Sequence, residues 1–137
     1  MFEKIASEEG FKKFPYKCTG DKLTIGYGFN LESSGIPEPV ARYWLQYNLE
    51  HLQAILSGYD FYDGLDLARQ TVLVDMAYQM GVDGLLRFKD MIKDIKVGAW
   101  DCASKSLLDS KYAREDSPNR AKRNAETMRT GKLLLNN

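Results

Sequence analysis

The sequence predicts an α+β protein that is mainly helical, with a small β-hairpin lobe and a larger helical lobe joined by one long helix. Strand-forming residues flank a single polar turn near residue 20, and nothing later in the chain reads clearly as a strand. From residue 66 onward, apolar residues recur at helical spacing. Between these two parts, residues 38–57 carry a long helical stripe. The sheet must therefore be small and the architecture two-lobed.

The bulk properties fit one domain over residues 1–137. The formal net charge is zero, with 19 basic and 19 acidic residues, so no overall field favours nucleic acid as a partner. Two cysteines do not indicate a disulfide framework, and the sequence does not decide whether Cys18 and Cys102 pair. No run reaches transmembrane length and the start is not a secretory signal, so we expect no stable membrane association.

The first helix and the hairpin follow from local signals. Residues 2, 5 and 6 are apolar on one helical face, which predicts a first helix from Phe2 to Glu9 that Gly10 ends. Strand-like residues before and after the turn Thr19–Lys22 predict a hairpin lobe over about residues 11–36. Residues 30–35 are expected to form a loop.

The connecting helix is predicted over about residues 38–57. Pro37 and Pro39 suit a first helical turn, where a missing N–H donor costs nothing. The apolar stripe that follows is Ala41, Leu45, Leu49, Leu52 and Leu56. A helix of about twenty residues is ~30 Å long, enough to join two lobes. Gly58 ends it.

The helical lobe is predicted over about residues 58–137, together with the first helix. Asp66 caps a helix from residue 67 to Met80 that is apolar almost all round, so we expect it to be the buried core helix. Gly81 should stop it. Amphipathic helices follow around residues 88–95 and 99–107. A last helix begins at Ser117-Pro118, with the serine expected as its cap, and Gly131 should end it. The leucine-rich tail has no evident role.

A candidate catalytic set lies at the first helix and the hairpin. Eight residues separate Glu9 from Cys18, and five separate Cys18 from Thr24. The hairpin would fold the thiol and the hydroxyl back toward the acid, giving the acid, base and hydroxyl that acid–base hydrolysis needs. Singly, each residue has an ordinary structural explanation. Gly26 and Gly28 in the returning strand favour function, because strand glycines often mark close approach by a backbone or ligand.

This spacing resembles the signature of the phage-type lysozymes, the endolysins of glycoside hydrolase family 24, in which the middle position is aspartate or cysteine. Two later segments are also similar to that family: Tyr78-Gln79-Met80-Gly81, and Ser117 to Arg123 with Met128-Arg129-Thr130-Gly131. The resemblance covers nearly the whole chain. It implies a lysozyme-like fold and a muramidase that hydrolyses the β-1,4 bond between N-acetylmuramic acid and N-acetylglucosamine.

The resemblance also implies roles for residues. Glu9 is the expected general acid, while Cys18 and Thr24 orient a water on the opposite face of the sugar, which inverts the anomeric carbon. No cofactor or metal is expected. Further expected residues are Phe29, Asn30, Tyr78, Gln79 and Ser106 for substrate binding, and Arg120 as a supporting residue near Glu9. A cation there would favour the ionised form of the acid. The segment between the hairpin and the long helix is shorter than in other family members.

The same resemblance implies a biological setting. The partner is bacterial peptidoglycan, and the enzyme is expected to act as a monomer. It would stay in the host cytoplasm until the membrane is permeabilised and then act on the periplasmic cell wall, causing lysis. Whether it is a free endolysin or part of a virion is not decided by the sequence.

Three other functions stay open. A lytic transglycosylase would cleave the same polymer without a water-activating base, and a non-catalytic peptidoglycan-binding module would cleave nothing. A nucleic-acid binder would use Arg120, Lys122 and Arg123, although a solvated helix face explains these charges more simply. The single histidine, His51, has no partner cluster and is expected to be exposed rather than catalytic or metal-binding.

Overall fold

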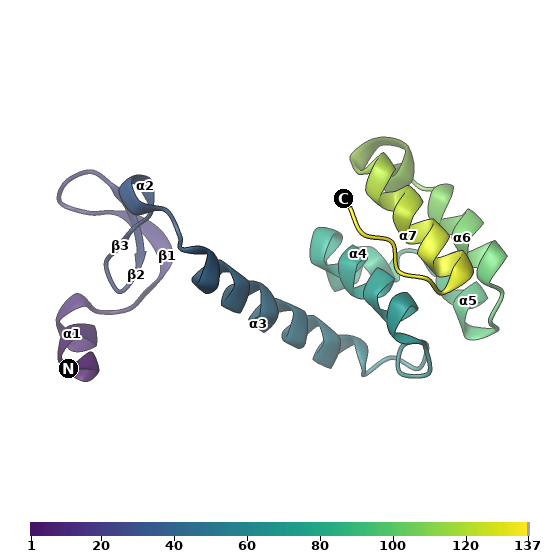
Figure 1. Cartoon of the computed structure of the whole chain (residues 1–137), viewed down its shortest axis with the longest axis horizontal. Helices are drawn as coiled ribbons and strands as arrows, with labels where there is room; N and C mark the ends of the chain where they lie inside the picture. Colours follow the sequence, from purple (N-terminus) through teal and green to yellow (C-terminus); the bar gives the residue numbers. More distant parts are fainter. Residues whose placement is uncertain (137) are drawn as a thin grey trace. The chain divides into compact units, whose positions relative to one another are not determined.

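The computed structural model describes residues 1–136, and the last residue of the expected helical lobe, 137, lies outside them. Figure 1 shows the order of the elements along the chain. The backbone divides into two compact units, Met1–Leu45 and Gln46–Asn137. Helix α3 (Glu38–Leu56) begins in the first unit and ends in the second. The expected grouping of the first helix with the helical lobe therefore stays a prediction.

The first unit contains a short helix and a three-stranded antiparallel sheet of order β1-β2-β3. Helix α1 (Phe2–Glu9) ends at Gly10, as the sequence predicts. Strands β1 (Lys12–Lys17) and β2 (Leu23–Gly26) form the predicted hairpin. In the sheet register, Thr24 on the central strand pairs with Tyr16 on one side and Asn30 on the other.

The prediction of a loop over residues 30–35 was wrong. Strand β3 (Phe29–Asn30) extends the sheet, and a single helical turn, α2 (Leu31–Ser34), follows directly. The physical reason is the side chain of Asn30, whose Oδ1 accepts a hydrogen bond of 3.0 Å from the backbone N–H of Ser33. This is an N-cap, which a polar residue before a short segment can supply without any longer periodic pattern.

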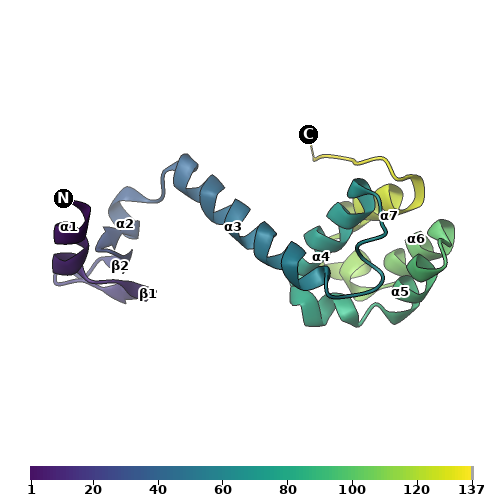
Figure 2. The same ribbon diagram turned by 90° about the horizontal axis from the view of Figure 1, so that it is seen from below.

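The second unit is helical. Its elements after α3 are α4 (Leu67–Leu86), α5 (Lys89–Lys96), α6 (Trp100–Leu108), the π-helical turn η1 (Tyr112–Asp116) and α7 (Pro118–Thr130). Both views show α5, α6 and α7 packed side by side (Figures 1 and 2). The α+β, mainly helical class predicted from the sequence is confirmed.

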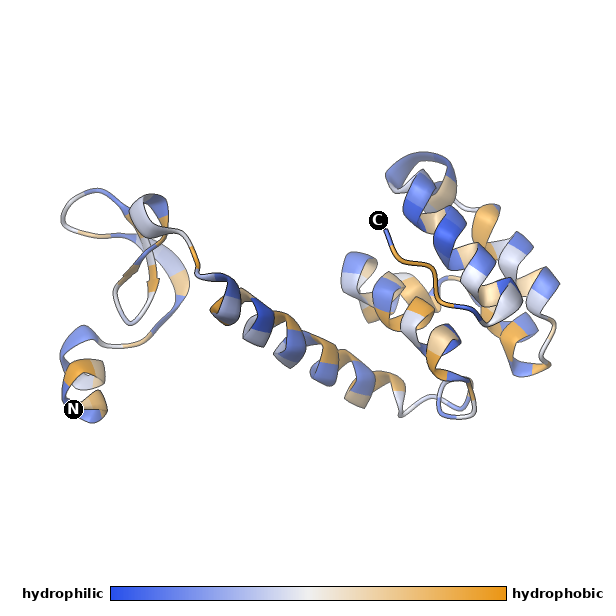
Figure 3. Ribbon diagram, viewed as in Figure 1, coloured by the Kyte–Doolittle hydropathy of each residue, from blue (hydrophilic) through white to orange (hydrophobic). Residues whose placement is uncertain are grey.

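Helix α4 contributes six buried side chains to the core of the second unit, and Figure 3 shows the mixed hydropathy of its helices. The largest fully buried side chains of this core include Leu56, Leu73, Met76, Leu85, Met91, Leu107 and Met128. The caps of α4 and α7 follow the sequence in part: the side chain of Asp66 accepts a hydrogen bond of 3.0 Å from the N–H of Arg69, and Gly131 closes α7 in the left-handed conformation. Of the leucine stripe on α3, only Leu56 is buried.

Two local expectations for this unit needed correction, and one turn was not expected at all. Gly81 does leave helical geometry, with φ 78° and ψ 162°, yet helical turns resume and α4 continues to Leu86. Ser117 precedes α7 but makes no side-chain cap, and its hydroxyl instead lies toward α4, where it accepts a hydrogen bond from Gln79. The turn η1 had no counterpart in the prediction, since π-helical turns leave no periodic signature in so few residues.

Candidate active site

The hairpin turn places Cys18 and Thr24 together. The turn is closed by backbone hydrogen bonds of 3.0 Å from the N–H of Cys18 to the carbonyl of Lys22 and of 2.9 Å from Asp21 to Cys18. Thr24 follows in β2 and is only 3% exposed, while Cys18 is a half-buried free thiol. The hydroxyl of Thr24 donates to the carbonyl of Lys22 at 2.9 Å. The tight turn therefore gathers one thiol, one hydroxyl and several backbone groups.

This environment stabilises the thiolate form of Cys18. Hydrogen bonds from the backbone of Lys22 and Gly20, and then from the side chain of Thr24, hold the pKa of the Cys18 thiol below its ordinary value. The partial burial of the thiol opposes this but is outweighed. A lowered pKa makes a cysteine a better base and nucleophile near neutral pH. The sequence could not predict this shift, because it depends on N–H groups of the turn.

Glu9 reaches the same sheet from the end of α1. Gly28, between β2 and β3, has a φ of +75°, and a Cβ atom placed on it would lie only 2.6 Å from Oε2 of Glu9. The carboxylate thus rests against a glycine that no larger residue could replace without displacing it. Close approach at this glycine was expected from the sequence, and the group that approaches it is the carboxylate of Glu9.

The neighbouring residues Phe29 and Asn30 have structural tasks of their own. The ring of Phe29 covers Gly26, where an added Cβ would lie 2.8 Å from Cδ2 of the ring, and Phe29 is 59% exposed. The side-chain oxygen of Asn30 caps α2, so it is occupied within the fold. Substrate contact by either residue stays a prediction.

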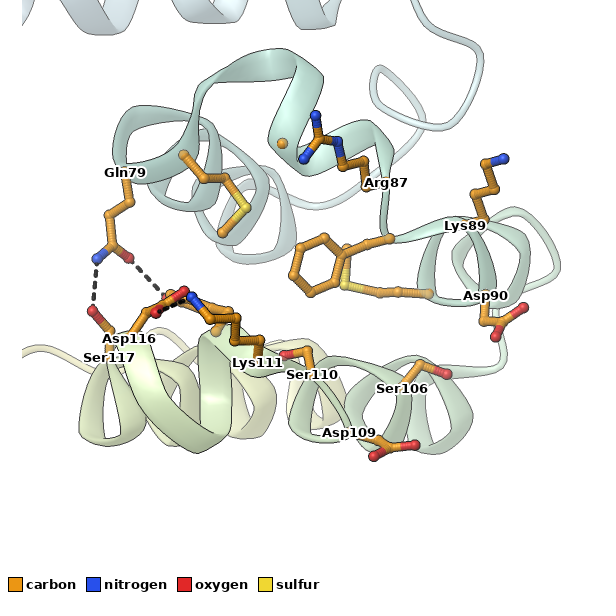
Figure 4. Close-up of a pocket in the computed structure, with 15 residues that line it drawn as sticks. Gln79, Arg87, Lys89, Asp90, Ser106, Asp109, Ser110, Lys111, Asp116 and Ser117 are labelled. Carbon is orange, nitrogen blue, oxygen red and sulfur yellow. Dashed lines mark hydrogen bonds and ion pairs between the residues drawn. The ribbon is translucent and has the colours of Figure 1, made fainter.

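In the second unit, two of the predicted residues line one pocket of about 680 Å³ (Figure 4). Gln79 and Ser106 both line it, whereas Tyr78 is not among its lining residues and is 48% exposed on α4. The hydroxyl of Ser106 donates to Oδ2 of Asp94 at 3.2 Å. Side chains of both charges surround the pocket: Arg87, Lys89, Asp90, Asp109, Lys111 and Asp116.

Arg120 is engaged with α4 rather than free. Its Nε lies 3.1 and 3.0 Å from the two carboxylate oxygens of Asp75, and its Nη2 also contacts Oδ1. The hydrogen bonds to Asp75 raise the pKa of Arg120, so its charge is firmly retained. Arg120 and Glu9 belong to different units, so the expected support of Glu9 by Arg120 stays a prediction.

Three residues of this region were missed by the sequence analysis: Asp75, Tyr112 and Asn124. Asn124 donates to Oδ2 of Asp75 at 2.7 Å and to the hydroxyl of Tyr112 at 3.1 Å. One signal was available for Asp75, since a carboxylate on an otherwise apolar core helix is rarely buried without a partner. The partner lies 45 residues away in the chain, so its identity needed the tertiary structure.

Other candidate sites receive less support. His51 is exposed on α3, and within residues 1–136 no three His, Cys, Asp or Glu side chains gather as metal ligands. Lys122 is exposed, while Arg120 and Arg123 are half-buried. None of the helices in the described part of the chain combines the length and apolar character needed to cross a membrane.

Comparison with known proteins identifies relatives. The sequence profile of the phage lysozyme family matches residues 6–126, which is most of the chain. A Dictyostelium discoideum protein described as probable T4-type lysozyme 1 is 35% identical over 72 residues, covering 53% of this chain and 42% of that protein. The aligned part of the chain thus spans about two fifths of that curated relative.

Proposed function

This chain belongs to the phage lysozyme family, and from that membership we propose that it is a glycosidase acting on bacterial peptidoglycan. More closely, it is a muramidase that hydrolyses the β-1,4 bond between N-acetylmuramic acid and N-acetylglucosamine. One observation supports this most directly: the Glu9 carboxylate rests against Gly28 on the same small sheet that holds the Cys18–Thr24 pair. An acid and a water-activating pair on one scaffold are what inverting hydrolysis uses.

In the proposed reaction, protonated Glu9 gives its proton to the glycosidic oxygen as the bond to the anomeric carbon breaks. A water held by Cys18 and Thr24 attacks that carbon from the opposite face and gives its proton to the Cys18 thiolate. Inversion of configuration follows from attack opposite the leaving group. The lowered pKa of the Cys18 thiol supports its part as base, because a neutral thiol would accept a proton poorly.

Product analysis on purified sacculi tests the proposal. We expect new reducing ends and no 1,6-anhydromuramic ends. Anhydro ends would show that the protein is a lytic transglycosylase and not a hydrolase. Binding to sacculi without release of sugar ends would show that it is a non-catalytic binding module. DNA binding that weakens steeply with salt would instead point to a nucleic-acid binder.

We further propose that the protein is an endolysin that acts as a monomer on the periplasmic cell wall of its host. In this proposal it stays in the cytoplasm until another factor opens the membrane, and lysis then follows. Expression with and without a co-expressed membrane-permeabilising protein tests this. Lysis, or appearance in the periplasm, on expression alone would contradict it.

A further inference from the structure

A directed chain of hydrogen bonds crosses the second unit from Asp75 on α4 to Ser117 before α7. Asp75, paired with Arg120, can only accept hydrogen bonds as a carboxylate. The amide nitrogen of Asn124 must therefore face it, and it does so at 2.7 Å. The same nitrogen donates its other hydrogen to the hydroxyl of Tyr112 at 3.1 Å. The acceptor end at Asp75 thus fixes the orientation of the Asn124 amide.

The fixed order of donors and acceptors continues from Tyr112 to Gln79. Because the Tyr112 hydroxyl accepts from Asn124, its own proton is free to donate, and it lies 2.8 Å from Oε1 of Gln79. The carbonyl of Gln79 is thereby occupied, and its Nε2 donates to Oγ of Ser117 at 3.0 Å. Figure 4 shows Gln79 with both of these interactions drawn as dashed lines.

The turn η1 ties together the two residues that hold Gln79. The backbone N–H of Ser117 donates to the carbonyl of Tyr112 at 2.9 Å, the wider hydrogen bond of a π-helical turn. Single π-helical turns are frequent at functional sites. Tyr112 is 5% exposed and packs its ring edge-on against Phe88, so its ring is buried and in contact with a neighbouring aromatic side chain.

Within residues 1–136, Nε2 of Gln79 has Ser117 as its hydrogen-bond acceptor, and one further N–H is left for a ligand in the pocket. We propose that Asn124 and Tyr112, anchored by Asp75, are positioning residues that lock the Gln79 amide so that it offers a donor to the substrate. This inference rests on the proposed function, with peptidoglycan as the substrate that Gln79 contacts in the pocket. The matching ligand group is an amide carbonyl oxygen, which N-acetyl sugars and peptides both carry. A flipped Gln79 would offer an acceptor and reject that group.

A double-mutant cycle tests the inference. Tyr112→Phe removes the hydroxyl but keeps the ring, and Asn124→Leu removes the directing amide at similar volume. Each should raise KM for soluble peptidoglycan fragments about three- to tenfold, the effect of one neutral hydrogen bond, with kcat changed less than about twofold. In a Gln79→Ala background, neither change should have a further effect on KM. Tyr62→Phe is the matched control, because it removes another buried tyrosine hydroxyl in the same unit and should leave KM unchanged.

A second readout needs no activity. In ¹⁵N-labelled protein, the side-chain NH₂ resonances of Gln79 should shift and broaden in Tyr112→Phe and in Asn124→Leu but not in Tyr62→Phe. Unchanged Gln79 resonances, or KM effects that persist in the Gln79→Ala background, would overturn the inference. If Tyr112→Phe fails to fold, Asn124→Leu carries the test. If the wild type releases no sugar ends, the muramidase proposal fails. The Gln79 resonances would still decide whether Asn124 and Tyr112 position the Gln79 amide.

Discussion

At the scale of single residues, the proposed site starts from the carboxylate of Glu9, which lies against Gly28. Glu9→Gln keeps the shape of the side chain but removes the transferable proton. We expect hydrolysis of sacculi to fall about 10²- to 10⁴-fold, the usual contribution of a general acid, while the melting temperature stays within a few degrees of the wild type. A variant that released reducing ends at close to the wild-type rate would show that Glu9 is not the acid.

Gly28 offers a matched comparison with Gly35. Both have positive φ, at +75° and +63°, but only Gly28 has the Glu9 carboxylate within contact distance of an added Cβ. Alanine at either position should destabilise the fold by about 1–2 kcal/mol through backbone strain. Only Gly28→Ala should also abolish hydrolysis, because it displaces the carboxylate. Thermal melts and sacculus assays on both variants check this, and equal activity of the two would remove Gly28 from the site.

Cys18 is the residue whose chemistry depends most on its surroundings. With its thiol pKa lowered, the alkylation rate by iodoacetamide should rise with pH to a plateau that is reached below the pH expected of a free cysteine. Thr24→Val removes one of the stabilising hydrogen bonds and should move the inflection to higher pH. Both proteins should carry Cys102→Ser, because Cys102 is exposed and would otherwise also react with iodoacetamide.

The same residue gives a test by activity. An aspartate at this position is ionised to much lower pH than a thiol, because the pKa values of the two groups in unfolded peptides are about 3.9 and 8.5. Cys18→Asp should therefore keep activity and extend it to lower pH, whereas Cys18→Ala should lose most of it. If Cys18→Ala hydrolysed sacculi as fast as the wild type, Cys18 would be a packing residue and not the base.

At the scale of elements, Arg69 joins α4 to the end of α7. Its Nε donates to the carbonyl of Met128 at 2.8 Å and its Nη2 to that of Arg129 at 3.2 Å, and its guanidinium lies 3.9 Å from the ring centre of Trp100. The side chain is 12% exposed. It thus satisfies carbonyl groups that a helix end leaves without partners, as a cation favoured there by the helix dipole.

Arg69→Met should therefore lower the free energy of unfolding by about 1.5–3 kcal/mol, the range for hydrogen bonds to a charged group. Arg114→Met is the control, because Arg114 forms a surface ion pair with Asp109 and is 60% exposed. Such exposed pairs contribute about 0–1 kcal/mol. Urea denaturation of both variants measures the difference. Equal losses of unfolding free energy would show that the contacts of Arg69 with the end of α7 do not stabilise the fold specifically.

At the scale of the whole molecule, Arg120 is predicted to support Glu9, although the two residues belong to different units. The planar guanidinium group of Arg120 already binds the carboxylate of Asp75. Arg120→Lys keeps the charge but loses the planar fork, so it should reduce sacculus hydrolysis more than Lys122→Arg on the same helix. Equal activity of the two variants would leave Arg120 with a structural role only.

The sequence by itself determined the fold class, the hairpin, the core helix and the caps at Asp66 and Gly131, because periodicity and capping are local properties. It also brought Glu9, Cys18 and Thr24 forward as candidates by their spacing. It failed at η1 and at α2, where a few residues are shaped by hydrogen bonds of single side chains and turns.

Only the tertiary structure decided what those candidates touch. The pairing of Asp75 with Arg120 and the hydrogen bond from Tyr112 to Gln79 join residues 45 and 33 positions apart. The contact of Glu9 with Gly28 and the lowered pKa of Cys18 depend on where the chain folds back. Distances and pKa shifts arise from groups that the fold brings together, and no local pattern of residue types encodes them.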